Sequence, residues 1–207
     1  MAPGIGRDQL VRNTVTVLGT LAEFHREPIP YNLGALVRLV SELRPDLLCL
    51  DITFDQWQRR DFGDLPPEYR EALLPLAYQT DIVVVPIAGE HPPAEPAAGG
   101  WRGRIIALLR RWLASLQRTA PGPTAFVGGP RHHLADLLYA VMAWLAGPHT
   151  YRAWKAYTNH LVREVLAVIR RDPGCRVLVA VNLRHCHHIR RALERHHEIR
   201  VVPYAQF

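Results

Sequence analysis

The segment "VNLRHCHHIRRALERHHEIRVV", residues 181–202, holds five of the eleven histidines of this 207-residue chain and begins inside an apolar run. Imidazole groups bind metals and transfer protons near neutral pH, so this density raises both chemistries. A metal site would need additional carboxylate or imidazole ligands, and the spacing differs from zinc motifs such as His-Glu-x-x-His. Three interpretations therefore stay open at this point: a metal site, a catalytic element, or a polar helix.

The five histidines have different expected roles. His185 would lie where a strand turns into a helix, and side chains at such turns face the ligand edge of a parallel sheet. His187 and His188 are adjacent, so they cannot share one helical face, and we expect both to be solvated. His196 and His197 would lie near the helix C-terminus, where positive charge interacts favourably with the helix dipole. We therefore expect chemistry or ligand contact only from His185.

Short apolar runs and helical patterns alternate along the chain. The runs predict strands at 14–20, 47–52, 81–87, 175–181 and 199–204. Helices are predicted after Asn32 as far as Pro45, after Pro66 with a kink at Pro75, at about 101–118, 131–146 and 149–171, and in the histidine-rich segment. This order predicts the α/β class, with a mainly parallel sheet of about five strands, helices on both faces, and a single domain over residues 1–207.

Two segments between these elements are expected to be irregular. The polar stretch at 53–65 is predicted to be a loop, and the stretch "AGEHPPAEPAAGG" at 88–100 is predicted to be a mobile loop because it is rich in Pro, Ala and Gly. In the helix at 131–146, periodicity predicts one inward face of apolar side chains: Leu134, Leu137, Leu138, Val141, Met142 and Leu145.

Polar side chains follow four of the predicted strands. Ligands of parallel sheets usually bind beyond the carboxyl ends of the strands, so we expect these side chains at one edge. They are Thr20, Glu23 and His25 after the first strand, Asp51 after the second, Glu90 and His91 after the third, and Asn182 and His185 after the fourth. Carboxylates and imidazoles in such a place are the usual groups of acid–base catalysis.

Composition restricts the partners. The formal charge is +6, but all 25 basic residues except Lys155 are arginine, which indicates a general preference for arginine, and we expect no nucleic-acid partner. No stretch of about 18 apolar residues occurs, and the first residues lack the apolar region of a secretory signal. We therefore expect neither membrane insertion nor export, no membrane partner, and a cytoplasmic protein with three reduced cysteines.

Five segments together resemble the TraB/Tiki/ChaN superfamily, whose fold is similar to that of erythromycin esterases. They are "VTVLGTLAEFH", "LRPDLLCLDI", "PPEYREALLPLAYQTDIVVVPI", "WKAYTNHLVREVL" and "RVLVAVNLRHCHHIRRALE". The resemblance spans most of the chain except about 88–146. It implies an α/β fold, and its members include metal-dependent peptidases, haem binders and ester hydrolases.

The resemblance also implies site positions, and this chain departs from several of them. The family has Gly-x-x-His after the first strand, where this chain has Gly19-Thr20-Leu21-Ala22. A glutamate ends the second strand of the family, and here the residue is Asp51. The Arg-Asn pair of the long helix is Thr158-Asn159, and the last Gly-x-x-His is Asn182-Leu183-Arg184-His185. His25 lies three residues beyond the vacant histidine position.

These departures determine the functional expectation. A centre without one imidazole has fewer ligands than a three-ligand catalytic metal site normally holds. We expect a degenerate TraB/Tiki-like domain that binds a small ligand or a protein partner at the carboxyl edge of its sheet. The alternative is a metal-dependent or acid–base hydrolase with a rebuilt centre. Cofactor, metal and oligomeric state stay open, although a divalent metal would suit the alternative. The candidate residues are His185, Asp51 and His25 for catalysis and Thr20, Glu23, Asn159 and Asn182 for ligand binding.

Overall fold

A single sheet of five parallel strands forms the centre of the protein. The structure is a computed structural model that describes residues 12–126 and 129–207. The strands are β1 (Asn13–Thr20), β2 (Leu47–Leu50), β3 (Val83–Pro86), β4 (Arg176–Asn182) and β5 (Ile199–Val201), in the order β3-β2-β4-β1-β5. Because β1 and β4 are covered on both faces, their side chains are almost all buried. This confirms the predicted α/β class and parallel sheet.

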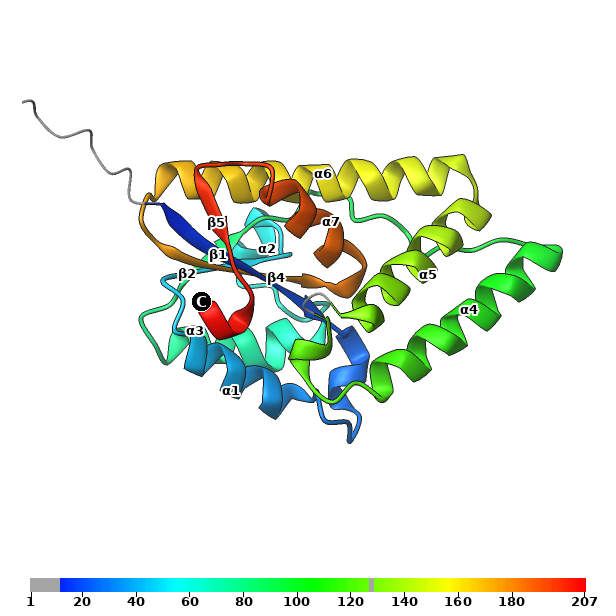
Figure 1. Cartoon of the computed structure of the whole chain (residues 1–207), viewed down its shortest axis with the longest axis horizontal. Coiled ribbons are helices and arrows are strands. Elements are labelled where there is room, and N and C mark those ends of the chain that lie inside the picture. Colours follow the sequence, from blue (N-terminus) through cyan, green and yellow to red (C-terminus); the bar gives the residue numbers. More distant parts are fainter. Residues whose placement is uncertain (1–11, 127–128) are drawn as a thin grey trace, which may run out of the picture.

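Seven α-helices accompany the sheet within the described residues. They are α1 (Leu33–Leu43), α2 (Phe54–Arg59), α3 (Leu74–Tyr78), α4 (Gly100–Arg118), α5 (Pro130–Ala146), α6 (Pro148–Arg171) and α7 (Leu183–Leu193). Figure 1 shows α6 along one side of the sheet and α1 and α3 along the other, while α4 and α5 extend beyond the strands. Helices therefore cover both faces, as predicted.

The sequence signals for α1 act as expected. The Asn32 side chain accepts a hydrogen bond from the Ala35 amide at 3.0 Å and so caps the first turn. The helix ends at Leu43, where Arg44 adopts a left-handed conformation directly before Pro45. Leu36 and Val40 are fully buried in the hydrophobic core. The helix thus begins and ends at the predicted residues.

The predicted loop at 53–65 is partly wrong, because its first residues form α2. Thr53 accepts a hydrogen bond from the Gln56 amide at 3.1 Å, and the Gln56 side chain accepts one from the Thr53 amide at 3.0 Å. This reciprocal capping box stabilises a helix of only six residues. The sequence contains the capping-box pattern Thr-x-x-Gln, but the polar composition of the segment favours the prediction of a loop.

The predicted kink at Pro75 takes a different form. The segment η2 (Glu68–Leu73) is a π-helix that runs into α3, and Pro75 lies in the first turn of α3. Proline lacks an amide hydrogen and is tolerated in a first turn, so the wider π-turn accommodates it. Glu68 and Tyr69 are turned toward the protein interior as a result.

The predicted inward face of α5 is wrong at two residues. Leu138, Met142 and Leu145 are buried as expected, but Leu134 is 45% and Leu137 is 58% exposed. The apolar residues of α5 span more of the helix circumference than the contact with the rest of the protein covers. The helix is therefore apolar on both its inner and its outer side.

The segment between β3 and α4 contains no regular element, as predicted. Glu95 in this segment pairs with Arg184 of α7 at 3.1 Å, and the Pro96 carbonyl accepts a hydrogen bond from Arg110. The segment therefore crosses from the end of β3 to α7 and α4. It is referred to below as the 88–98 loop, and its predicted mobility stays a prediction.

Candidate functional site

Asp51 and His185 both lie at the carboxyl edge of the sheet. The register pairs Thr20 of β1 with Asn182 of β4 and Leu50 of β2 with Ala180 of β4. Asp51 follows directly after Leu50, and His185 lies in the first turn of α7 after β4. Parallel strands thus bring residues far apart in sequence to one edge, as expected for a ligand site of this class of sheet.

The Asp51 carboxylate is held by a tyrosine of α6. The Tyr157 hydroxyl donates a hydrogen bond of 2.6 Å to Oδ1 of Asp51. Burial raises the pKa of Asp51, and the hydrogen bond from Tyr157 together with the charges of Arg184 and His160 partly opposes this rise. Burial also raises the pKa of Tyr157, and the neighbouring carboxylate raises it further. Tyr157 therefore stays a neutral donor.

The backbone that follows β3 lies close to Tyr157 and His160. A Cβ atom on Gly89 would lie 3.1 Å from Cδ2 of His160 and 3.5 Å from the Tyr157 ring, so glycine permits close approach of the chain. The Gly89 amide opposes the rise in the pKa of Tyr157, but burial and Asp51 outweigh this effect. Within the described residues, Nε2 of His160 is buried and has no hydrogen-bond partner. Asp51, Tyr157, His160 and Arg184 are referred to below as the edge cluster.

Both ring nitrogens of His185 are already engaged. Nδ1 lies 2.6 Å from the Thr158 hydroxyl, which in turn lies 2.9 Å from the Trp154 carbonyl, and Arg184 Nε donates to Nε2 of His185 at 2.9 Å. The carbonyl can only accept, so the Thr158 hydroxyl donates to it and accepts from Nδ1–H of His185. His185 is thus a neutral imidazole, and burial holds its pKa well below the usual range. It positions Arg184 and Thr158.

His25 is engaged in the same way by the backbone. Its Nε2 accepts a hydrogen bond from the Leu21 amide at 2.9 Å, so Nδ1–H donates to the Tyr31 carbonyl at 2.9 Å. The side chain is 1% exposed, and burial lowers its pKa to about 4. His25 therefore fixes the turn after β1, and it presents no unoccupied nitrogen to a ligand.

A second buried carboxyl group lies near the edge, and the sequence interpretation missed it. Glu68 is 1% exposed, burial raises its pKa, and its Oε2 lacks a hydrogen-bond partner in the described part of the chain. The nearby Thr20 hydroxyl partly opposes this rise, and its own oxygen is also buried without a hydrogen-bond partner among the described residues. Burial raises the pKa of Tyr69, and the charges of Asp51 and Glu68 raise it further. Tyr69 thus lies within electrostatic range of both carboxyl groups.

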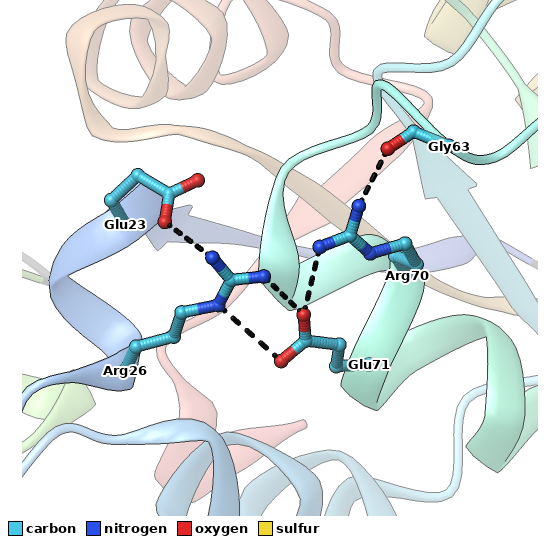
Figure 2. A network of polar contacts seen from close by, with 5 residues as sticks. All are labelled: Glu23, Arg26, Gly63, Arg70 and Glu71. Atoms are coloured by element: carbon cyan, nitrogen blue, oxygen red, sulfur yellow. Dashed lines mark hydrogen bonds and ion pairs between the residues drawn. The ribbon is translucent and has the colours of Figure 1, made fainter.

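Glu23 does not belong to the edge cluster. It is exposed and pairs with Arg26 at 2.9 Å, as Figure 2 shows. Arg26 also contacts Glu71 of η2, which in turn pairs with Arg70. This surface network ties the turn after β1 to η2. Glu23 therefore has a structural partner outside the edge cluster, and its predicted ligand contact stays a prediction.

The remaining predicted ligand residues lie apart from one another. Asn182 accepts a hydrogen bond from the Arg184 amide at 3.1 Å and so caps α7. Asn159 is exposed and lines a groove of about 430 Å³ between α6 and α7. Glu90 and His91 are exposed in the 88–98 loop. The edge cluster lies at the carboxyl edge together with Thr20 and His185, and Glu68 lies nearby.

His187 and His188 both contact α5; the His187 side chain is only 16% exposed, contrary to the prediction, whereas the His188 side chain is 41% exposed. Nδ1 of His187 lies 2.9 Å from Nε2 of His132, and His188 lies 3.2 Å from Asp136. His196 and His197 follow the end of α7 at Leu193. Residues 12–126 and 129–207 contain no group of three or more histidine, cysteine or acidic side chains that could hold a metal ion. His187 and His188 therefore link α7 to α5.

No family model, curated protein or solved structure matches the chain. In the part of the chain that the structure describes, no helix has the length and apolar character needed to cross a membrane.

Proposed function

We propose that the protein binds a small polar ligand at the carboxyl edge of its sheet, as a divergent TraB/Tiki-like domain without the histidine chemistry of that superfamily. The observation that carries this proposal is the 2.6 Å hydrogen bond between Tyr157 and Oδ1 of Asp51. It fixes a partly buried carboxylate at the place where parallel sheets bind ligands. The hydrogen bonds among the described residues leave Oδ2 of Asp51 unused, so it is the atom we assign to the ligand.

The edge cluster suggests the chemical class of this ligand. Asp51 supplies an acceptor, while Arg184 and His160 supply donors. A molecule that carries both donor and acceptor groups, such as an amino acid or a hydroxy acid, satisfies all three. The 88–98 loop contacts Arg184 through Glu95, so the loop covers this part of the edge and favours a small ligand over a protein surface.

Binding is favoured over hydrolysis because of the two histidines. A histidine that acts as a general base needs an unoccupied ring nitrogen within reach of the proton that it removes. Nε2 of His185 accepts from Arg184, and Nε2 of His25 accepts from the Leu21 amide. Neither imidazole is therefore assigned a catalytic role in this proposal.

A hydrolase remains the second candidate, with carboxyl groups in place of imidazoles. Burial raises the pKa of both Asp51 and Glu68 above the ordinary value of such groups. A raised pKa makes a carboxyl group more readily protonated than an ordinary one, which suits the role of a general acid. Substitution of Glu68 by glutamine would abolish such an activity and leave ligand binding at Asp51 intact.

Thermal-shift screening with a panel of amino acids, hydroxy acids and divalent metal salts tests the proposal. A true ligand raises the melting temperature of the wild-type protein. Asp51→Asn should lose this shift, whereas Asp81→Asn, an exposed carboxylate before β3, should keep it. Stoichiometric bound metal that is lost on Asp51→Ala would favour the hydrolase. An identical shift in Asp51→Asn and in the wild type would refute binding at the edge cluster.

The proposal also places the protein in the cytoplasm. Cys49, Cys175 and Cys186 all carry free thiols. Free thiols are typical of reducing compartments.

A further inference from the structure

Helix α4 exposes a continuous apolar stripe. Trp101 is 64%, Ile105 37%, Leu108 48% and Trp112 60% exposed. The spacing of four, three and four residues places these four side chains on one face of the helix. They are referred to below as the α4 stripe. Single exposed apolar residues are ordinary, but four large ones on one face indicate an interaction surface.

The stripe is separate from the face by which α4 packs onto the protein. Ile106, Leu113 and Gln117 are buried, and α4 packs against α5. Ile106 and Leu113 are seven residues apart and form their own helical row. The α4 stripe is therefore a second apolar face, which the fold itself does not use. Figure 1 shows α4 at the periphery of the molecule, well away from the strands.

The charge of α4 is positive throughout. Residues 100–118 contain five arginines and no aspartate or glutamate. Arg104 and Arg111 lie four residues before and three residues after Leu108, so both lie along one side of the α4 stripe. Neither has an acidic partner among residues 12–126 and 129–207, whereas Arg110 pairs with Glu95 and Arg118 with Glu27. Two uncompensated cations thus border the apolar face.

We propose that α4 docks onto an anionic lipid surface and lies in the plane of the interface. An amphipathic helix with tryptophans on its apolar face and arginines beside it has the composition of interfacial helices. Tryptophan favours the boundary between lipid and water, and each arginine gains from anionic headgroups. A second copy of the chain is disfavoured as the occupant, because two α4 helices would bring like charges together.

This contact differs from crossing a membrane. The expectation of no membrane partner rested on the lack of a spanning segment, and within the described residues that finding stands. A helix that lies in the interface needs only one apolar face and a length that is independent of the bilayer thickness. The exposed Leu134, Leu137 and Trp144 of the adjacent α5 add to the apolar surface of this part of the protein.

Sedimentation with vesicles tests the proposal on the full chain. The wild type should bind phosphatidylcholine vesicles that contain phosphatidylglycerol, and its tryptophan fluorescence should shift to shorter wavelength. Vesicles of phosphatidylcholine alone should bind it much more weakly. Arg104→Gln combined with Arg111→Gln should weaken binding to the anionic vesicles roughly 30-fold, since each cation near such a surface contributes about 1 kcal/mol.

Matched variants test whether vesicle binding needs the α4 stripe itself or only exposed aromatic and basic side chains anywhere on the protein. Trp112→Ala should weaken vesicle binding at least about tenfold, because burial of one tryptophan contributes more than the 1.4 kcal/mol that a tenfold change represents. Phe54→Ala, which removes an aromatic side chain that is 63% exposed on α2, should leave binding unchanged. The double variant Arg38→Gln and Arg200→Gln is the charge control, with two exposed arginines elsewhere.

Three outcomes would overturn the proposal. The first is a wild-type protein that does not bind anionic vesicles. The second is an equal loss of binding in the control variants, which would indicate attraction by net charge alone. The third is a dimer in solution that Trp112→Ala dissociates, which would assign the stripe to a second copy. Circular dichroism melting of each variant checks that all of them are folded.

Discussion

Two buried histidines of this protein act as hydrogen-bonded structural groups. His25 joins the Leu21 amide to the Tyr31 carbonyl, and His185 joins Arg184 to Thr158. Both are neutral, because burial lowers their pKa values. Sequence position could predict that His185 lies at the carboxyl edge. It could not predict the partners of its ring nitrogens, because those partners come from α6 and from the orientation of the Arg184 side chain.

Because buried His25 is neutral in the folded protein, the free energy of unfolding depends on pH. The pKa of His25 is about 4 in the folded protein and 6.5 in the unfolded chain, which therefore binds the additional proton between these values. The part of the stability that depends on neutral His25 is fully present above pH 6.5 and is lost as the pH decreases to about 4. The contribution of His25 is about 3 kcal/mol. His25→Gln should lose less stability over this range, measured by urea unfolding at several pH values. Parallel curves for the two proteins would contradict this assignment.

Substitution by glutamine separates His185 from the later histidines. His185→Gln should lower the free energy of unfolding by about 2 kcal/mol, because it disturbs buried hydrogen bonds to Thr158 and Arg184. His197→Gln should change it by less than about 0.5 kcal/mol, because His197 is exposed beyond the end of α7. Urea unfolding of the two variants and the wild type at one fixed pH measures the two effects. Equal effects would mean that His185 has no special structural role.

Substitution of Asp51 should abolish ligand binding without lowering the free energy of unfolding. Burial raises its pKa, so the folded protein resists its ionisation and loses stability as the pH rises through the range of its titration. Asp51→Asn removes this cost and keeps an oxygen that can accept the Tyr157 hydrogen bond. The variant should therefore be at least as stable as the wild type at pH 7 while it loses the ligand. A variant that is less stable at pH 7 and unchanged at pH 4 would contradict this account.

At the scale of elements, α7 depends on a glycine in β1. A Cβ on Gly19 would lie 2.8 Å from Cδ1 of Leu183 and 3.5 Å from Cβ of Cys186, so α7 packs directly on the strand backbone. Gly19→Ala should lower the free energy of unfolding by about 1–3 kcal/mol, since this contact cannot hold another carbon without movement. Gly99→Ala is the control, because nothing lies within 4 Å of its added carbon. Similar unfolding midpoints for the two variants would refute the packing argument.

The 88–98 loop is the element whose behaviour the sequence predicts most specifically. Its amides should exchange hydrogen much faster than those of β1 and β4, because few of its groups are buried. Glu95→Ala should increase exchange further at the amides of residues 94 and 95, since it removes the ion pair to Arg184. Mass spectrometry of deuterium uptake measures both effects. Protection equal to that of the strands would show that the loop is a fixed part of the structure.

Regular elements could be predicted from the sequence because their signals are local. The strands, the cap at Asn32 and the helices after residue 100 follow from apolar periodicity and capping residues. The π-turn that buries Glu68 and the partners of His187 depend on contacts between distant segments. These contacts have no local signal. The outer apolar side of α4 and α5 was also unpredictable, because periodicity identifies apolar faces without showing which face the protein covers.

At the scale of the whole molecule, the sheet gathers the candidate site from segments far apart in sequence. Asp51 follows β2, Tyr157 and His160 lie on α6, and Arg184 lies on α7. The α4 stripe lies on a different element, so ligand binding and surface docking can be tested independently. Substitutions in the edge cluster should leave vesicle binding unchanged, and Trp112→Ala should leave the ligand-induced thermal shift unchanged.

A crystallographic fragment screen tests the central claim most directly, because it shows where small polar molecules bind even when the natural ligand is unidentified. Crystals of the wild type would be soaked with amino-acid-like and hydroxy-acid-like fragments, and crystals of Asp51→Asn would serve as the control. The account predicts fragments in contact with Oδ2 of Asp51 and with Arg184 or His160 in the wild type, and their loss in the variant. Fragments that bind only elsewhere, or that bind equally in the Asp51→Asn crystals, would contradict it.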